Sequence, residues 1–497
     1  MTFLGDEGRD VLVVYNILHG KLTLLGPTAY VGGFFLGPIY YYFMAPFLWL
    51  FNYNPVGPAV MVALFGVATV GLLYKFSSEF FNKRVGIIAS SLYAISPLVI
   101  AYSRSSWNPN LVPFFSLLTL YVLYRAVRDK KLILFFASGV LLGITMQLHY
   151  LAFFLGAIMF AYLSKVSTVE SFFGKSKNSL TDFIKRNLLI FSGFIIGLSP
   201  FFAFEARHGF TNISSIFKFI ISSGDTGPGR DLTANISDVF FRMFARLVVN
   251  YPSSDQISVY MHSNIEIWHL VSLLIGLISL AVLLFNLFMS VPNRNNFKEK
   301  FPNFLKLSLL SVWLVLGIVL FGFYKKNIYD YYFGFMFVVP FILVAYALDF
   351  LSSRNKILKM ICFLIFLGLV AINLYGIPFK NPPNRQLNQM KTIAQSVLDR
   401  TDTKPFNFAL IAKGNSDHAY RYFFTIEGHP PVTIENKSID PDRKTVTDQL
   451  LVICEEPCQP LGNSLWEVAG FGRAEIAEEW SEIVIKAYKL VHYKESN

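Results

Sequence analysis

The sequence predicts a polytopic α-helical membrane protein with a small α/β domain at its carboxyl end. Of its 497 residues, 54% are hydrophobic, above the roughly 45–50% of ordinary soluble domains. The 51 Phe and 25 Tyr residues suit lipid-facing and interfacial surfaces. Ten apolar runs are long enough to cross a bilayer, which takes about 20 residues each. At about residue 378 the composition turns polar, and we place the end of the membrane domain there.

The predicted spans share high apolarity and few charges. They cover residues 57–75, 86–103, 111–127, 132–147, 149–165, 188–205, 266–290, 304–323, 330–350 and 357–377. The run 38–53 is also apolar, but it is short, rich in Tyr and Trp, and interrupted by Pro46. We interpret it as a helix that lies at the membrane interface.

The distribution of Lys and Arg predicts the orientation. Five loops on one side hold most of these cations, whereas the opposite short loops hold only Arg104 and the pair Lys325-Lys326. By the positive-inside rule the five loops are cytoplasmic, so both termini lie on the outer side. If 38–53 were counted as a span, residues 1–37 would lie on the cytoplasmic side. The net charge of +11 is spread over these loops, which argues against a nucleic-acid partner.

The outer amino terminus has no leader-like segment ahead of it. We therefore expect that a first transmembrane helix precedes Met1 in the gene. The membrane domain then covers residues 1–377, with a first outer loop at 1–56. A second outer loop, 206–265, contains the glycine-rich stretch 224–229 and an amphipathic segment around Phe240 and Met243. Such a segment can rest on the membrane surface and move as a lid.

Residues 378–497 are predicted to form an α/β domain outside the membrane. The pattern favours a helix at 386–399, strands at 407–412 and 449–454, and either a helix or a strand at 475–488. Cys454 and Cys458 lie in this domain, where either a local disulfide or two free thiols is compatible with the sequence. Cys362 lies in an apolar run and is expected to be buried. A zinc site would need further ligands that the sequence does not place nearby.

The strongest candidates for chemistry are Asp6 and Glu7, adjacent carboxylates in the first outer loop. A carboxylate at the rim of a membrane bundle can act as a general base for a hydroxyl group or as a metal ligand. The alternative is structural: acidic residues stabilise helix amino termini, and a helix is expected from Val11 to Leu18.

Three further outer turns carry polar groups that could bind a phosphate. Arg104 stands alone between two spans, and His149 lies at the turn between two close helices. Lys325 and Lys326 precede a tyrosine-rich segment that includes Tyr331 and Tyr332, side chains suited to a sugar and a phosphate. The alternatives are a snorkelling Arg, an interfacial His and an aromatic belt with Lys anchors. Because these three turns and the first outer loop all lie on the outer side, one cavity could gather Asp6, Arg104, His149, Lys325 and Lys326.

These motifs resemble the C-type membrane glycosyltransferases (GT-C). The likeness is greatest to the group of glycosyltransferase family 39 and the aminoarabinose transferases, which includes protein O-mannosyltransferases. The matching segments are Asp6-Glu7, Pro38–Tyr42, Phe80–Gly86, Leu92–Pro97, Ser103-Arg104, and Tyr331-Tyr332 with Pro340. Relatives often carry an Asp shortly after the Arg of the second outer loop. This chain has Asn108 and Asn110 there, so the role of a second carboxylate is left open.

The resemblance implies transfer of a sugar from a polyprenyl-phosphate donor. Asp6 would be the general base, and Glu7 would orient the acceptor or a metal. Arg104 would bind the donor phosphate, with His149 as a further contact and with Lys325 and Lys326 matched only by their loop. No cofactor is certain, although a divalent metal can take part. The acceptor would be a protein, a lipid or a glycan, and the enzyme would face outward from the cytoplasmic membrane.

Two other functions are compatible with the sequence. One is a transporter or flippase of lipid-linked sugars, against which the chain shows no inverted repeat and no paired broken spans. The other is a non-catalytic scaffold whose outer domain binds a partner. Neither a P-loop nor a nucleotide-binding glycine motif follows a strand, in keeping with a lipid-linked donor and not a nucleotide-linked one.

Overall fold

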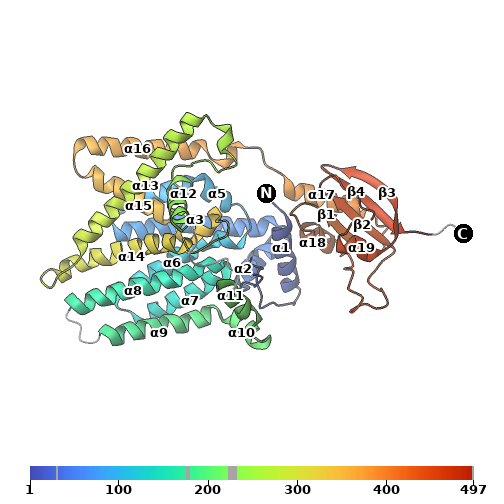
Figure 1. Ribbon diagram of the computed structural model, residues 1–497, viewed down its shortest axis with the longest axis horizontal. Coiled ribbons are helices and arrows are strands. Elements are labelled where there is room, and N and C mark those ends of the chain that lie inside the picture. The colour runs from blue at the N-terminus through green and yellow to red at the C-terminus, as the bar shows by residue number, and fades with distance from the viewer. Residues whose placement is uncertain (30–31, 175–178, 222–231, 495–497) are drawn as a thin grey trace. The chain divides into compact units, whose positions relative to one another are not determined.

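The computed structural model describes residues 1–29, 32–174, 179–221 and 232–494 (Figure 1). The chain divides into two compact units. Unit 1 contains Met1–Leu22, Tyr41–Pro58 and Pro382–Asn497, and unit 2 contains Thr23–Tyr40 and Ala59–Asn381. The amino-terminal segment that carries Asp6 and Glu7 therefore belongs to the same unit as the carboxyl-terminal domain.

Unit 2 is built from helices, apart from an isolated bridge between Thr28 and Phe35. In chain order its helices are α3 (Val56–Phe80, which begins in unit 1), α4 (Lys83–Ile95), α5 (Pro97–Tyr102), η1 (Asn108–Leu111), α6 (Val112–Asp129), α7 (Leu132–Leu148), η2 (Tyr150–Ala152), α8 (Phe153–Phe173), α9 (Ser179–Gly197), α10 (Ser199–Arg207), α11 (Thr211–Ile221), α12 (Leu232–Ala245), η3 (Ile257–Val259), α13 (His262–Ser290), α14 (Phe297–Phe321), η4 (Asp330–Met336), α15 (Val339–Ser352), α16 (Lys356–Tyr375) and η5 (Pro378–Lys380).

The predicted polytopic helical architecture is confirmed. Among the described residues, six helices have the length and apolarity to cross a membrane: α3, α6 with η1, α8 with η2, α13, α14 and α16 with its extension to Lys380. Two bent pairs, α9–α10 at 67° and η4–α15 at 61°, raise the number to eight. The two other predicted runs, 86–103 and 132–147, correspond to α4–α5 and to α7, which are shorter.

Prolines explain several of the breaks. Pro97 begins α5, and Pro200 and Pro340 lie in the first turns of α10 and α15. Proline lacks the N–H that a continuing helix would use and disfavours helical geometry at the preceding residue, but it fits the first turn of a new helix. The predicted span 86–103 is therefore two helices, α4 and α5, that meet at Ser96.

Small residues allow α7 and α9 to pack closely. A Cβ atom on Gly139 would lie 2.0 Å from the carbonyl oxygen of Ile190, and one on Gly193 would lie 2.1 Å from that of Phe136. Glycine at such positions lets two backbones approach, which is a common device in membrane bundles, where lipid gives no hydrophobic drive for association.

The loop 206–265, predicted to lie on the outer side, is largely helical, with α11, α12 and η3 in its described part; the glycine-rich stretch 224–229 lies outside the described residues. The apolar face of α12 and the following turn is buried within the protein, since Met243, Phe244 and Leu247 are at most 1% exposed. These three side chains therefore pack against protein and not against lipid.

Unit 1 combines most of the helix α2 (Ile39–Leu50) with α1 (Gly5–Leu18) and the polar carboxyl-terminal domain. That domain contains α17 (Gln386–Leu398), β1 (Asn407–Ile411), α18 (His418–Ile426), β2 (Gln449–Cys454), α19 (Trp466–Phe471), β3 (Ala474–Glu482) and β4 (Ile485–His492). The sheet order is β1-β2-β4-β3, with β1 and β2 parallel and the other neighbours antiparallel. Its core includes Ala409, Leu450, Val452, Tyr488 and Leu490.

Several local predictions for this domain are confirmed. The helix at 386–399 and the strands at 407–412 and 449–454 form within one residue of their predicted ends. The ambiguous segment 475–488 is strand, shared between the two arms of the β3–β4 hairpin. Cys454 and Cys458 form a disulfide just after β2, and Cys362 is buried with a free thiol.

Candidate active site

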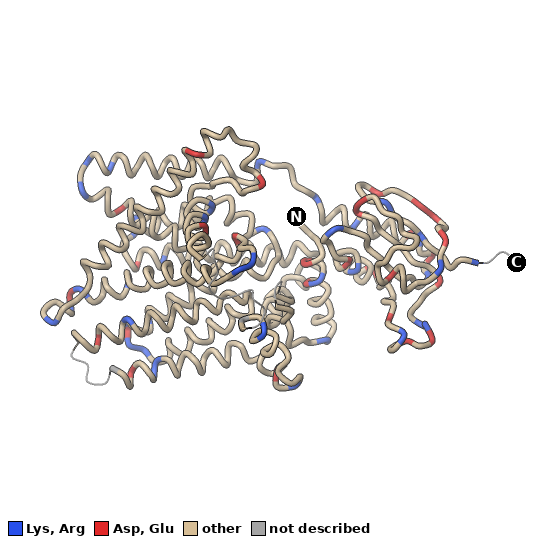
Figure 2. The backbone as a smooth tube through the Cα atoms, in the orientation of Figure 1, with Lys and Arg blue, Asp and Glu red and all other residues tan. Residues whose placement is uncertain are grey.

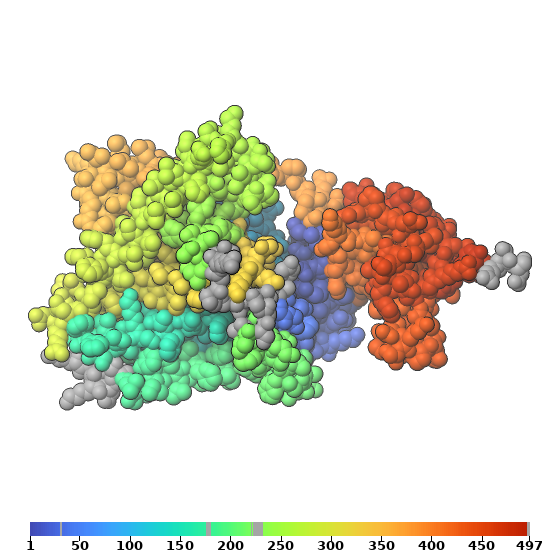
Figure 3. All heavy atoms as spheres, viewed as in Figure 1, coloured from blue at the N-terminus to red at the C-terminus, as the bar shows by residue number. Residues whose placement is uncertain are grey.

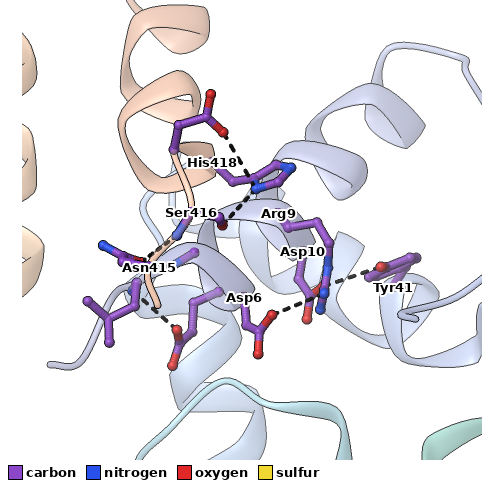
Figure 4. A network of polar contacts seen from close by, with 11 residues as sticks. Asp6, Arg9, Asp10, Tyr41, Asn415, Ser416 and His418 are labelled. Atoms are coloured by element: carbon purple, nitrogen blue, oxygen red, sulfur yellow. Dashed lines mark hydrogen bonds and ion pairs between the residues drawn. The ribbon is translucent and has the colours of Figure 1, made fainter. Parts of the chain in front are cut away.

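Helix α1 presents the Asp6-Glu7 pair, and close packing on α18 fixes its position (Figure 4). The backbone N–H of Gly5 donates to Asn415 Oδ1 at 3.1 Å. A Cβ atom on Gly8 would lie 2.3 Å from the backbone nitrogen of Ala419, so only glycine permits this approach. The start of α1 is thereby attached directly to the carboxyl-terminal domain within unit 1.

The two candidate carboxylates have different surroundings. The side chain of Asp6 is 60% exposed, and its Oδ1 accepts a hydrogen bond from Arg9 Nη1 at 3.0 Å. Glu7 is buried, and its Oε2 accepts the backbone N–H of Leu4 at 3.2 Å. Glu7 therefore satisfies an N–H at the helix start, as in a capping box, which is the structural alternative raised for the pair. Asp6 is the carboxylate that an incoming hydroxyl group can reach.

Asp10, which the sequence analysis did not select, is fully buried beside this pair. Its Oδ1 accepts hydrogen bonds from Arg9 Nε at 2.9 Å and from the Tyr41 hydroxyl at 3.2 Å, while its Oδ2 is buried and has no hydrogen-bond partner among the described residues. Burial raises the pKa of Asp10 to about 7, against the opposing effect of Arg9. Figure 4 shows the side chains of Asp6, Arg9, Asp10 and Tyr41 gathered at this place. The spacing of Asp6, Arg9 and Asp10 along a helix was the available sequence signal.

The loop that precedes α18 adds polar groups to the same surroundings. Ser416 Oγ and His418 Nδ1 are 2.9 Å apart, and Asn415 Nδ2 donates to the Glu455 carboxylate at 2.9 Å. Burial lowers the pKa of His418, partly offset by the nearby Asp417. These residues lie some 410 positions from α1 in sequence, as the Gly5–Asn415 bond shows, so no local pattern could reveal their proximity.

In unit 2 the fold brings His149, Tyr331 and Tyr332 together. The His149 ring lies 5.8 Å from the ring of Tyr331 and 5.4 Å from that of Tyr332, measured between centroids. Trp107 packs on Tyr331 at 4.4 Å. His149 is buried, and its Nδ1 accepts the backbone N–H of Leu151 at 3.3 Å. This nitrogen therefore caps η2, which fixes the ring within the aromatic cluster.

Arg104 is exposed, and its guanidinium stacks on Phe379 at 4.9 Å. The Asn residues that stand where relatives carry an Asp have structural hydrogen bonds: Asn108 Nδ2 donates to Leu148 O at 2.6 Å, and Asn110 Nδ2 donates to Ser105 O at 2.9 Å. These bonds shape the loop around Arg104. Beside it lies a small pocket whose lining includes Tyr102, Ser103, Asn110 and Tyr331.

Lys325 and Lys326 are exposed directly after the buried Tyr324. The Tyr324 hydroxyl lies 3.0 Å from that of Tyr150, and its ring contacts Tyr332 at 5.8 Å. The lysine turn is therefore attached, through Tyr324, to the aromatic cluster around His149.

Two ion pairs that the sequence analysis did not predict fix the segment that carries Tyr331 and Tyr332. Arg242 Nε and Arg246 Nε, on and just after α12, bond the two oxygens of Asp330 at 3.0 Å and 3.1 Å. All three side chains are largely buried. Asp330 begins η4, so α12 fixes the element that carries Tyr331 and Tyr332. Arg242 and Arg246 are four residues apart and so share one face of a helical segment, but Asp330 lies more than 80 residues further along the chain.

The donor groups do not fit a resident metal ion. Over the described ranges, no three His, Cys, Asp or Glu side chains come together in a way that could hold one. The Asp6 carboxylate pairs with Arg9, and that of Glu7 bonds a backbone N–H. No reaction step is therefore derived through a metal. Asp6 and Glu7 belong to unit 1, whereas Arg104, His149, Lys325, Lys326, Tyr331 and Tyr332 belong to unit 2.

Comparisons with known proteins agree with this architecture. The family described as dolichyl-phosphate-mannose-protein mannosyltransferase matches residues 36–196, which include Arg104 and His149. YkcB of Bacillus subtilis (strain 168), a protein named as a mannosyltransferase, is 35% identical over 82 residues, or 16% of this chain. ArnT from Cupriavidus metallidurans, solved with undecaprenyl phosphate, superimposes with a TM-score of 0.57, covering 98% of this chain and 94% of ArnT at 12% identity.

The chain therefore has the fold of the GT-C membrane proteins, and its residues 36–196 are similar to the mannosyltransferase family. A second solved structure has the same fold: AglB, the archaeal oligosaccharyltransferase from Archaeoglobus fulgidus, in complex with an inhibitory peptide and a dolichol-phosphate. It matches at a TM-score of 0.50 and 13% identity over 90% of this chain and 65% of AglB. The chain thus spans less than two thirds of AglB, and the region matched in YkcB is 12% of that protein.

Proposed function

We propose that this GT-C protein transfers a sugar from a polyprenyl-phosphate donor to a hydroxyl acceptor at the outer face of the cytoplasmic membrane, with Asp6 as the general base. The observation that carries the proposal is the exposed Asp6 carboxylate, held at a fixed helix start beside Arg9. The family match and the lipid phosphates bound by ArnT and AglB support a lipid-linked donor.

The reaction needs one bond formed and one broken. The acceptor oxygen attacks the anomeric carbon, and its proton passes to the Asp6 carboxylate. The bond between the anomeric carbon and the phosphate oxygen breaks, and the polyprenyl phosphate leaves with the electron pair. Its growing negative charge needs cations, and the exposed Arg104 guanidinium is our candidate for the main contact.

The remaining residues have supporting roles in this proposal. Lys325 and Lys326 supply further positive charge, and His149, Tyr331 and Tyr332 bind the sugar and the phosphate. Glu7 fixes the helix start through its bond to Leu4, and so orients Asp6 toward the acceptor. The acceptor is a protein, a lipid or a glycan, and a hexose and a pentose are both candidate sugars.

The base is tested by substituting Asp6→Asn in proteoliposomes supplied with radiolabelled polyprenyl-phosphate sugars and an acceptor extract. Loss of a general base should lower turnover about 100-fold or more while donor binding is retained. Asp442→Asn is the matched control, because Asp442 is an exposed carboxylate of the same unit that pairs with Lys444. Near-normal turnover in Asp6→Asn would remove Asp6 from this role.

The phosphate contact is tested with Arg104→Ala. Removal of a guanidinium that binds the donor phosphate should raise the donor KM by about tenfold or more, since charge-assisted contacts of this kind contribute about 1.5–3 kcal/mol. Arg207→Ala, at the exposed end of α10, is the control. An unchanged donor affinity would contradict the assignment. If a folded wild-type protein released label from no donor, the transporter and scaffold alternatives would be favoured.

A further inference from the structure

A second cavity in unit 2 lies away from the candidate active site. It has a volume of about 340 Å³ and lies where the ends of α3, α13 and α14 meet α15. Its polar lining comes mainly from α14, with Glu299, Lys300, Asn303 and Lys306. This end of unit 2 carries cationic loops that the charge distribution assigns to the cytoplasmic side, and Figure 2 shows the blue positions at the turn between α13 and α14.

Lys306 is the most informative residue of this cavity. It lies well inside α14, which begins at Phe297 and is a candidate span, and it is half-buried. In the part of the chain that the structure describes, its ammonium group has neither a hydrogen bond nor an ion pair. Ionisable side chains inside a membrane helix are costly and normally face a partner or a functional cavity. Because Lys306 faces a cavity, a bound ligand can supply the partner for its ammonium group.

The charge of the cavity favours an anion. Lys300 and Lys306 supply two ammonium groups against the single carboxylate of Glu299, and the Asn303 side chain lies one helical turn before Lys306 on the same face. Lys300 Nζ donates to the backbone oxygen of Met289 at 2.8 Å, which holds it at the rim. The charge of Glu79 in α3 also attracts Lys306, but Glu79 is itself paired with Arg125 and Arg128, and the charge of Arg128 opposes that attraction.

The walls of the cavity favour a lipid over a soluble anion. Phe81 and Tyr346 stack at 4.1 Å to form an aromatic wall. On α13, beside the cavity, Phe285, Phe288 and Met289 are 53%, 78% and 52% exposed. Figure 3 shows α13, in yellow-green, on the surface of unit 2. The cationic cavity therefore adjoins an exposed apolar surface on α13. A molecule with a charged headgroup and long hydrocarbon chains requires this combination.

We propose that this cavity binds the headgroup of an anionic phospholipid, with Lys306 and Asn303 as phosphate contacts and the acyl chains along α13. Basic pockets between membrane helices on the cytoplasmic side are suited to such headgroups. The site is independent of the proposed transfer reaction, since it uses none of the residues assigned to it. Its occupant comes from the inner leaflet of the membrane in which the protein lies.

The test compares lipids retained by the full-length protein in native mass spectrometry after exchange into mixed phosphatidylglycerol and phosphatidylcholine micelles. The wild type should retain phosphatidylglycerol preferentially, and Lys306→Gln should reduce that retention by about fivefold, as expected for one cation near a lipid phosphate. Lys298→Gln is the matched control, because Lys298 is an exposed lysine of the same helix that does not line the cavity. Equal retention by wild type and Lys306→Gln would overturn the proposal.

Two further arms address folding and the source of the phosphate. Asn303→Ala leaves the charge unchanged and should still reduce phosphatidylglycerol retention relative to Lys298→Gln; no reduction in this variant would count against the site. Added glycerol 3-phosphate should not displace the lipid at equal concentration, because it lacks the acyl chains. Equal competition by glycerol 3-phosphate would show a site for soluble phosphate and would overturn the lipid assignment.

Discussion

At the amino-terminal end of α1, one arginine serves two carboxylates. Arg9 bonds Asp6 through Nη1 at 3.0 Å and Asp10 through Nε at 2.9 Å, although Asp6 is exposed and Asp10 is fully buried. Arg9, which pairs with the proposed base Asp6, is therefore also bonded to the buried carboxylate of Asp10, which no substrate can reach. The Tyr41 hydroxyl supports the same oxygen of Asp10, so this contact fixes the guanidinium beside Asp6.

The burial of Asp10 has a consequence for stability that depends on pH. Its pKa is raised from an ordinary value of 3.8 to about 7. Between these values the folded protein keeps a proton that the unfolded chain has lost, so the contribution of Asp10 to stability is complete below about pH 4 and lost as pH rises through 7. Asp10→Asn should remove this decline, and the Tm of wild type and variant should diverge between about pH 4 and pH 7 in detergent.

The matched control for this measurement is Asp442→Asn, which changes an exposed carboxylate of the same unit. Its Tm should follow that of the wild type at every pH. Parallel curves for wild type and Asp10→Asn would contradict the raised pKa.

The sequence analysis selected exposed charged residues as candidates more readily than buried ones. Asp6, Arg104 and the two lysines were selected because charges at membrane rims are few and stand out. Asp10 was not selected, because its burial depends on Tyr41 and on the packing of α1, which a local pattern does not contain. Ser416 and His418 were missed for a related reason, since only the fold places the α18 loop beside α1.

At the scale of elements, the α1–α18 contact depends on glycine. A Cβ atom on Gly8 would lie 2.3 Å from the backbone nitrogen and 2.5 Å from the Cα of Ala419. Backbone atoms cannot move aside as a flexible side chain can, so Gly8→Ala should separate the helices. We expect a loss of stability of about 1–3 kcal/mol, the usual range for overpacking, together with reduced turnover because Asp6 shifts with α1.

The control for this substitution is Gly71→Ala in α3, where an added Cβ would meet no atom within 4 Å. Alanine is the better helix former, so this variant should be as stable as the wild type or more stable by up to about 1 kcal/mol. Thermal unfolding of the two variants gives the comparison. Equal Tm values for Gly8→Ala and wild type would show that α1 does not pack on α18 in this way.

Element boundaries were predicted well where composition alone decides them. The strands 407–412 and 449–454 were found because short β-branched and aromatic runs are bounded by polar turns. The span 86–103 was read as one helix although Pro97 divides it into α4 and α5. The apolar face of α12 was interpreted as facing the membrane, because amphipathic periodicity does not distinguish a lipid surface from a protein one. Its burial follows from tertiary contacts, including the arginine bonds to Asp330.

For the molecule as a whole, the charge asymmetry of the loops predicts the side of the membrane on which each part of the chain lies. The turn between α13 and α14 should then be cytoplasmic and the carboxyl-terminal domain outside. The orientation can be tested by cysteine labelling, because Cys454 and Cys458 are joined in a disulfide and Cys362 is buried. With Cys362→Ser, a single cysteine introduced at an exposed position becomes the reactive thiol.

Two exposed positions are suitable for labelling: Asn295 in the α13–α14 turn, which is predicted to be cytoplasmic, and Lys437 in the carboxyl-terminal domain, which is predicted to lie outside. In intact cells, a membrane-impermeant maleimide should label Lys437→Cys and should label Asn295→Cys only after permeabilisation. The reversed pattern would place the domain in the cytoplasm and would contradict transfer at the outer face. Labelling of both in intact cells would contradict the assignment of the basic loops. The expected pattern would bring the exposed Asp6 carboxylate, which belongs to the same unit as Lys437, to the side on which an outer acceptor is found.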